Sequence, residues 1–124
     1  MIITKSIPYN KLKKKLNKNR SIGIVGCNTC ARMCNTGDKK AMLKLKRNLK
    51  KDRFSVVDMD LISVACCEDQ IAKEKYDGDI TIVLACDAGV YNVRKFSKKV
   101  IPGLITLGIG SWDMKGNYKL VKRF

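Results

Sequence analysis

The sequence predicts an α/β fold, a small doubly wound parallel sheet of about four strands with helices on both faces. Short apolar segments rich in Ile and Val alternate along the chain with segments whose apolar residues recur at helical spacing. Such alternation implies β-α-β crossovers, which place consecutive strands parallel in one sheet. At 124 residues, the chain is expected to form a single domain over residues 1–124.

The N-terminal part of the chain is predicted to supply one helix and one strand. Residues 8–19 are expected to be helical, because Leu12 and Leu16 lie four positions apart and lysines fill most of the positions around them. A short buried strand follows at Ile22–Gly26. The glycine that ends this segment is expected to let the backbone turn sharply.

The middle of the chain is predicted to supply two helices and the second strand. Asn35–Asp38 is turn-like, and Asp38 is a suitable N-cap for a helix over Lys39–Lys51 that has an apolar side and a basic side. The segment Phe54–Asp60 is predicted to form the second strand. A shorter helix is expected over Glu68–Tyr76.

The clearest strand is the third, Ile80–Ala85, a continuous apolar and β-branched run that is typical of a parallel strand covered on both faces. A helix over Val90–Lys98 and a fourth strand within Val100–Leu107 are expected to follow. The glycines at positions 108 and 110 are expected to end that strand, and Tyr118–Val121 is predicted as a further short strand. The predicted order of the parallel strands is 2-1-3-4.

Three cysteines follow the first strand directly, with the spacing C-x2-C-x3-C at Cys27, Cys30 and Cys34. Thiols this close together in a loop are more typical of metal ligands than of packing. The chain has no histidine, so a metal site would consist mainly of thiolates, which favour zinc or an iron–sulfur cluster. Buried inert cysteines, or a thioredoxin-like dithiol at Cys27 and Cys30, are the alternatives.

The remaining cysteines also follow predicted strands. Cys66 and Cys67 come after the second strand, and Cys86 comes directly after the third. Strands one and three are neighbours in the predicted order, so Cys86 is expected to lie beside the loop that contains Cys27. The sequence leaves open whether Cys66 or Cys67 takes the place of Cys86. The predicted ligands of a [4Fe–4S] cluster, or alternatively of zinc, are Cys27, Cys30, Cys34 and Cys86.

The formal net charge is +15, from 26 Lys and Arg against 11 Asp and Glu. Such a charge attracts anions, which include nucleic acid, a phosphorylated cofactor, an acidic protein surface and an anionic membrane surface, and a basic surface that is only solvated is the simpler alternative. Nucleic acid is not the expected partner, because no nucleic-acid-binding motif accompanies the charge. The sequence contains no segment that is expected to act as a signal peptide or to span a membrane. With thiols that would stay reduced, this predicts a cytoplasmic location.

Two motifs give the sequence a resemblance to a known family. They are V-G-C-N-T-C-A-R-M-C-N-T-G-D and L-A-C-D-A-G-V, and V-I-P-G-L-I-T-L-G-I-G follows the second. Together they resemble the methylenetetrahydrofolate reductase C-terminal-like family, over a range from about Lys5 to Gly110. Members of that family include the small cysteine-rich subunit that accompanies the flavin-bearing reductase subunit in acetogenic bacteria.

The resemblance implies a metal-binding protein that works as the partner of a larger enzyme. In that family the cysteines bind zinc or iron–sulfur clusters, and the matching positions are Cys27, Cys30, Cys34 and Cys86. Longer members continue into a second cysteine-rich region, whereas this sequence has no cysteine after Cys86. The resemblance therefore implies one cluster and not a relay of several.

Three functions fit these observations. The first is a non-catalytic accessory subunit that carries one all-cysteine cluster and transfers electrons to or from a larger flavin-type redox enzyme, such as a methylenetetrahydrofolate reductase. The second is a zinc-binding structural or protein-interaction module without redox activity. The third is an enzyme that uses the Cys27 loop for thiol chemistry or anion binding, and it has the least support. The sequence has no histidine base, no Walker A motif and no G-x-G-x-x-G motif.

Overall fold

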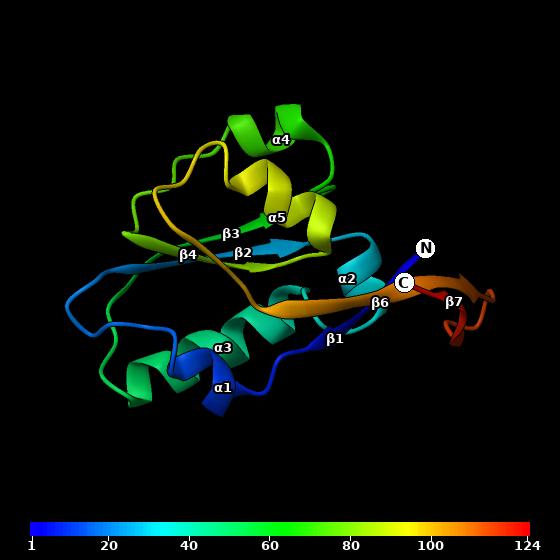
Figure 1. Ribbon diagram of the computed structural model, residues 1–124, viewed down its shortest axis with the longest axis horizontal. Helices are drawn as coiled ribbons and strands as arrows, with labels where there is room; N and C mark the ends of the chain where they lie inside the picture. The colour runs from blue at the N-terminus through cyan, green and yellow to red at the C-terminus, as the bar shows by residue number, and fades with distance from the viewer.

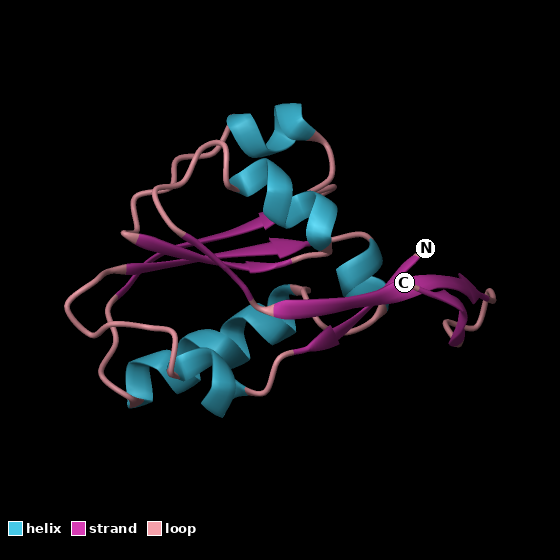
Figure 2. Cartoon of the chain, viewed as in Figure 1, coloured by secondary structure: helices cyan, strands magenta, loops and turns pink.

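A computed structural model describes all residues, 1–124, and contains two sheets (Figure 1, Figure 2). The strands of the parallel sheet are β2 (Ile22–Cys27), β3 (Val56–Ile62), β4 (Ile80–Leu84) and β5 (Val100–Pro102), in the order β3-β2-β4-β5. The strands of the antiparallel sheet are β1 (Ile2–Ser6), β6 (Leu104–Trp112) and β7 (Tyr118–Arg123), in the order β1-β6-β7. The predicted α/β class with a four-stranded parallel sheet is confirmed. The antiparallel sheet was not predicted.

Five helices pack beside these sheets. They are α1 (Tyr9–Lys13), α2 (Cys30–Met33), α3 (Lys39–Lys51), α4 (Glu68–Ala72) and α5 (Asp87–Val93). In Figure 1, α1 and α3 lie below the parallel sheet, whereas α4 and α5 lie above it. None of the helices has the length and apolar character needed to cross a bilayer.

The core lies at the two central strands of the parallel sheet. Every residue of β2 and of β4 is buried. Ile24 pairs with Ile82 and Val25 with Val83, and all four residues are fully buried. Continuous apolar runs such as these form strands that are covered on both faces, as the sequence indicated for Ile80–Ala85.

The long helix α3 begins and ends where the sequence predicts. The Asp38 side chain caps it by accepting a hydrogen bond of 3.0 Å from the Ala41 amide. Met42, Leu45 and Leu49 are its buried residues, and they face the parallel sheet. The basic residues between them lie toward solvent, as expected for an amphipathic helix.

Gly26 does not form the sharp turn that was predicted for it, because it lies within β2. Its importance is in packing. A Cβ atom at Gly26 would lie 2.5 Å from the Gly37 carbonyl oxygen and 2.5 Å from the Met42 sulfur. The absence of a side chain therefore allows α3 and the segment before it to approach β2 closely.

Several predicted boundaries are wrong. The first helix covers only Tyr9–Lys13. Helix α4 ends at Ala72, and the Tyr76 hydroxyl folds back to donate a hydrogen bond of 2.6 Å to the Ile71 carbonyl. Helix α5 begins at Asp87, which is earlier than the sequence indicated. Local sequence pattern alone does not locate such helix boundaries.

The predicted end of the fourth strand at positions 108 and 110 is also wrong. The chain forms the short β5 and then continues through both glycines as β6. A side chain at Gly110 would collide with Ile3 of β1, and one at Gly108 would collide with the Lys122 backbone of β7, so both positions require glycine for close packing. Together β6 and β7 form a hairpin that projects away from the helices (Figure 1).

Candidate functional site

Loops that follow three neighbouring strands meet at the carboxyl edge of the parallel sheet. They cover residues 28–29 after β2, residues 63–67 after β3 and residues 85–86 after β4. The Asn28 amide donates a hydrogen bond of 2.8 Å to the Ile62 carbonyl, which continues the pairing of β2 and β3 into the loops. This edge is where open α/β sheets bind their ligands.

Side chains also join these loops to one another. The Thr29 hydroxyl donates to the Ser63 carbonyl, which links the loop after β2 to the loop after β3. The Asn92 side chain on α5 is buried and donates a hydrogen bond of 3.1 Å to the Ala65 carbonyl. The loop after β3 is thus held between the end of β2 and the helix that follows β4.

Two of the predicted ligands come from the segment around the end of β2. Cys27 is the last residue of that strand and is buried, and its sulfur accepts a hydrogen bond of 3.5 Å from the Ala65 amide. Cys30 is the first residue of α2 and is half-buried. The contact with Ala65 brings the β3 loop directly against Cys27.

Cys66 and Cys86 lie at the same edge. Cys66 follows Ala65 and is exposed, whereas Cys86 directly precedes α5 and is half-buried. Partial burial of its thiol raises the pKa of Cys66, and the nearby thiols of Cys86, Cys27 and Cys30 raise it further because neighbouring thiolates repel one another. We refer to these residues as the edge thiols: Cys27, Cys30, Cys66 and Cys86.

The thiol of Cys34, also a predicted ligand, is directed toward a different part of the molecule. Cys34 is buried, and its sulfur donates a hydrogen bond of 3.8 Å to the Ile2 carbonyl of β1. Nearby, the Thr36 and Thr4 hydroxyls share a hydrogen bond of 2.7 Å, which also fastens this segment to β1. Because β1 was not predicted, the packing of Cys34 against it was not predicted either.

The edge thiols do not form a ready-made metal site. No three Cys, Asp or Glu side chains lie close enough together to hold a metal ion, and all six cysteines are free thiols. The donor chemistry nevertheless fits, since four thiols suit both tetrahedral zinc and an iron–sulfur cluster. Binding would require the three loops to draw these sulfur atoms closer together.

Gly37 fixes the approach of the segment between α2 and α3 to the end of β4. A Cβ atom at this position would meet the Leu84 backbone oxygen and would lie 2.6 Å from the Ala31 side chain. A larger residue would push this segment away from the strand that leads to Cys86. Gly37 therefore allows the segment between α2 and α3 to lie close to the end of β4. From the sequence, only a turn was predicted at this position.

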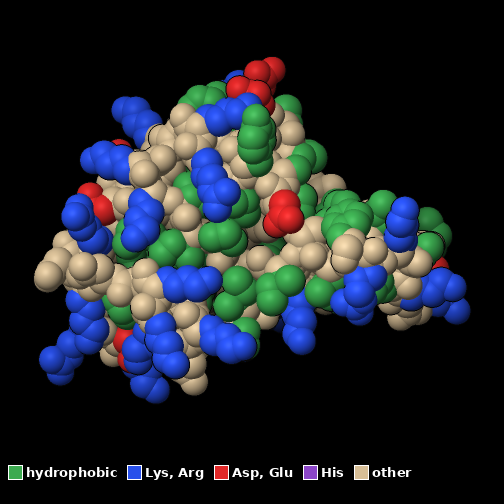
Figure 3. Space-filling view, viewed as in Figure 1, with side chains coloured by type: hydrophobic (Ala, Val, Ile, Leu, Met, Phe, Trp, Pro, Cys, Tyr) green, Lys and Arg blue, Asp and Glu red, His purple; other side chains and the backbone are tan.

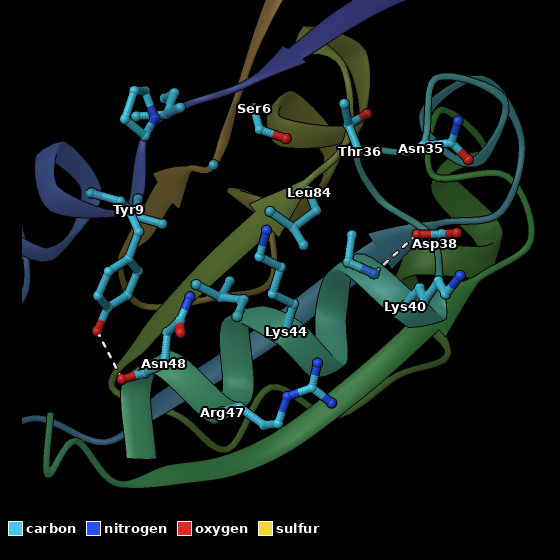
Figure 4. A pocket seen from close by; sticks show the side chains of 16 residues that line it. Ser6, Tyr9, Asn35, Thr36, Asp38, Lys40, Lys44, Arg47, Asn48 and Leu84 are labelled. Atoms are coloured by element: carbon cyan, nitrogen blue, oxygen red, sulfur yellow. Dashed lines mark hydrogen bonds between the residues drawn. The ribbon is translucent and has the colours of Figure 1, made fainter. Parts of the chain in front are cut away.

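Two further surface features were not found from the sequence. One is a cavity between α1 and α3, lined by basic side chains of α3 (Figure 4). The other is the β6–β7 hairpin, which exposes several large apolar side chains. Both depend on β1 and β6, whose pairing joins the two ends of the chain and is not visible in local sequence patterns.

Comparison of the chain with protein-family models, with curated proteins and with solved structures finds no match. The resemblance to the methylenetetrahydrofolate reductase C-terminal-like family therefore stays a prediction.

Proposed function

We propose that this chain is a cytoplasmic, non-catalytic accessory protein that holds one all-cysteine iron–sulfur cluster of the [4Fe–4S] type. It would transfer electrons to or from a larger flavin-bearing redox enzyme. The observation that supports this proposal is the gathering of the edge thiols from three separate loops at the carboxyl edge of the sheet. The absence of histidine argues against a thiol enzyme, which needs a nearby base to activate its nucleophile.

The arrangement favours Cys66 over Cys34 as the fourth ligand beside Cys27, Cys30 and Cys86. Cys66 is exposed on a loop that already contacts Cys27 through Ala65. Cys34 is buried against β1, and its thiol would have to leave the Ile2 carbonyl in order to bind a metal. The proposed ligand set therefore differs from the set predicted from the sequence at one position.

Zinc is the alternative occupant of the same thiols. The edge thiols lie on loops that follow three different strands. A tetrahedral zinc ion bound to these thiols would cross-link the loops, which favours zinc. The protein would then be a structural or interaction module without redox activity. The ligand residues would be unchanged.

Anaerobic purification followed by iron, sulfide and zinc analysis of one sample tests the proposal. We expect a brown protein that contains iron and sulfide in about equal amounts. A colourless protein with about one zinc per chain would replace the cluster by the zinc alternative. A colourless protein without metal would contradict both.

Serine variants test the ligand set. Cys66→Ser and Cys86→Ser are expected to lose most of the bound metal, because each removes one thiolate. Cys34→Ser should keep its metal, since a serine hydroxyl can still donate to the Ile2 carbonyl. Cys67→Ser changes the neighbouring thiol in the same loop. It is the matched control and should keep its metal. Loss of metal in Cys34→Ser with retention in Cys66→Ser would restore the ligand set predicted from the sequence.

The β6–β7 hairpin is the surface that we propose for the partner. Seven of its large apolar side chains are between 41% and 94% exposed, and Figure 3 shows hydrophobic side chains among basic ones on the projecting part of the molecule. Exposed apolar patches of this kind mark protein interfaces. We call these residues the hairpin patch: Ile105, Ile109, Trp112, Met114, Tyr118, Val121 and Phe124.

The charge around the hairpin patch indicates an acidic partner. The turn and β7 carry Lys115, Lys119, Lys122 and Arg123. The one carboxylate of the turn, Asp113, is occupied by the backbone amides of its own turn. A second copy of this chain would bring the same cations together, so a protein with an apolar centre and an acidic rim is the better match. The flavin-bearing reductase implied by the sequence resemblance is the candidate of that class.

A further inference from the structure

A cavity of about 620 Å³ lies on the side of the parallel sheet that α3 covers (Figure 4). One wall is the stretch from the end of β1 into α1, residues 6–12, and the other is α3. Leu84 at the end of β4 closes the back. This volume is in the range of natural small-molecule sites, which is about 300–1,000 Å³.

The wall formed by α3 is strongly basic. Lys40, Lys44 and Arg47 line the cavity, at spacings that place them along one side of the helix. Neither of the two ion pairs of the molecule, Lys13–Asp52 and Lys95–Glu68, involves these residues. Three like charges without counter-ions repel one another, and an anion bound between them would relieve that repulsion.

Asp38 is the only carboxylate that lines the cavity, and it is already used. Its side chain accepts the hydrogen bond from the Ala41 amide that caps α3. It forms no ion pair with Lys44, whose side chain extends from α3 toward the middle of the cavity, and one carboxylate cannot balance three cations (Figure 4). The cavity keeps a net positive charge.

Neutral groups around Lys44 complete a mixed lining. The side chains of Ser6 and Asn48 line the cavity and have no hydrogen-bond partner within the protein, so both are free to bind a ligand. Leu12, Leu45 and Leu84 supply a buried apolar floor. Such a lining suits a molecule that has an apolar part and an anionic group.

The wall opposite α3 is held in place by Tyr9. Its hydroxyl donates to the Asp52 carboxylate over 2.6 Å and to the Asn48 carbonyl over 3.1 Å. These bonds tie the start of α1 to the end of α3, so the cavity is a fixed feature of the fold. A preformed backbone lowers the ordering cost of binding a ligand.

We propose that this cavity binds a small organic anion, with a phosphate or carboxylate group beside Lys40, Lys44 and Arg47 and an apolar part on the leucine floor. The site is separate from the edge thiols and does not depend on a bound metal. Other lysines of α3, such as Lys50, lie outside the cavity and carry the same charge. Substitution of such a lysine therefore shows whether an anion binds in the cavity or only to the basic surface of the helix.

Titration of the purified chain with phenyl phosphate, inorganic phosphate and benzoate tests the proposal, with amide chemical shifts as the readout. We expect saturable shifts at Ser6, Lys44 and Asn48, and tighter binding of phenyl phosphate than of inorganic phosphate. Lys44→Ala should weaken binding of phenyl phosphate about tenfold or more, since it removes a charged hydrogen-bond donor. Lys50→Ala, the matched control, should bind like the unaltered chain.

Three outcomes would overturn the proposal. One is the absence of saturable shifts with any of the three probes. Another is an equal loss of affinity in Lys44→Ala and Lys50→Ala, which would show that only the general surface charge attracts the anion. The third is equal affinity for phenyl phosphate and inorganic phosphate, which would mean that the apolar floor takes no part. Both lysines are exposed, so neither variant is expected to unfold, and a thermal melt checks this.

Discussion

The parallel sheet and the β6–β7 hairpin contain similar apolar residues, but the sheet buries them whereas the hairpin exposes several of them. The strand β4 reads I-T-I-V-L, and every one of its residues is buried. The strand β6 reads L-I-T-L-G-I-G-S-W, and its residues Ile105, Ile109 and Trp112 are exposed. The difference arises from what covers each sheet, because helices lie on both sides of β4 whereas β6 projects beyond them (Figure 1).

This contrast indicates which apolar side chains stabilise the fold and which ones remain available for a partner. Burial of apolar surface stabilises the fold by about 25 cal/mol for each Å², so the fully covered strands contribute most of that free energy. Apolar side chains on the hairpin gain little of it while they are exposed. They would gain it on binding, which supports the proposal that they contact a partner.

Truncation of one isoleucine in each region tests this difference between the two sheets most directly. Ile82→Ala in β4 removes a side chain that is fully buried, and it should lower the free energy of unfolding by about 2–5 kcal/mol. Ile109→Ala in β6 removes one that is 44% exposed, and it should cost about 1 kcal/mol or less. Urea denaturation of both variants under identical conditions measures the two effects.

The control for this pair is a conservative change at the same buried position. Ile82→Val should cost about 0.5–1.5 kcal/mol, which is less than the alanine variant. Equal losses at Ile82 and Ile109 would mean that the hairpin belongs to the stabilising core. The distinction between the two sheets would then fail.

The hairpin also marks the limit of what the sequence could predict. The parallel strands and α3 were found because each has a local signature, either a continuous apolar run or an amphipathic repeat with a capping Asp38. The pairing of β1 with β6 joins residues about 100 positions apart, so no local pattern reports it. The antiparallel sheet, with the large apolar side chains that its hairpin exposes, was therefore not predicted.

The second prediction concerns recognition, with a purified flavin-bearing methylenetetrahydrofolate reductase of the acetogen type as the probe. Trp112→Ala should weaken binding by about 2 kcal/mol or more, because tryptophans dominate the energy of protein interfaces. The same change should leave thermal stability nearly unaltered, since Trp112 is 50% exposed. Binding is measured by calorimetry, and stability by a thermal melt.

Tyr91→Ala is a matched control for this experiment. Tyr91 is also a large exposed aromatic residue, at 64%, but it lies on α5 and away from the hairpin. It should leave binding of the reductase unchanged. An equal loss in both variants would contradict the assignment of the interface to the hairpin, and no binding by the unaltered chain would contradict this choice of partner.

The location of the candidate site was predictable from the sequence, whereas only some of its residues were. Cysteines that follow β2, β3 and β4 had to meet at one edge once the sheet was parallel, and Cys27 and Cys86 follow that rule. Cys34 differs because it follows α2, where the chain turns toward β1. Spacing in the sequence placed it with Cys27 and Cys30, but the direction of its thiol depends on a strand from the other end of the fold.

A weaker effect is expected in the parallel sheet at its edge strand β3, which contains Asp60. Burial raises the pKa of the Asp60 carboxyl, and the nearby carboxylates of Glu74, Asp58 and Asp77 raise it further. The folded state therefore holds this proton more tightly than the unfolded state does. The stability associated with Asp60 is fully present below its ordinary pKa, and it is lost as the pH rises through the raised value.

Asp60→Asn should consequently stabilise the protein at pH 7, by less than about 1 kcal/mol because the group is largely solvated. The gain should disappear below about pH 3.8, the ordinary pKa of the carboxyl, where the unaltered side chain is neutral in both states. Thermal melts from pH 3 to pH 8 measure the difference. Asp69→Asn on α4 removes the same charge from an exposed position and should give no gain at any pH. A gain that persists at low pH would mean that Asp60 opposes folding through its packing and not through its charge, so that even the covered sheet would contain a poorly packed strand.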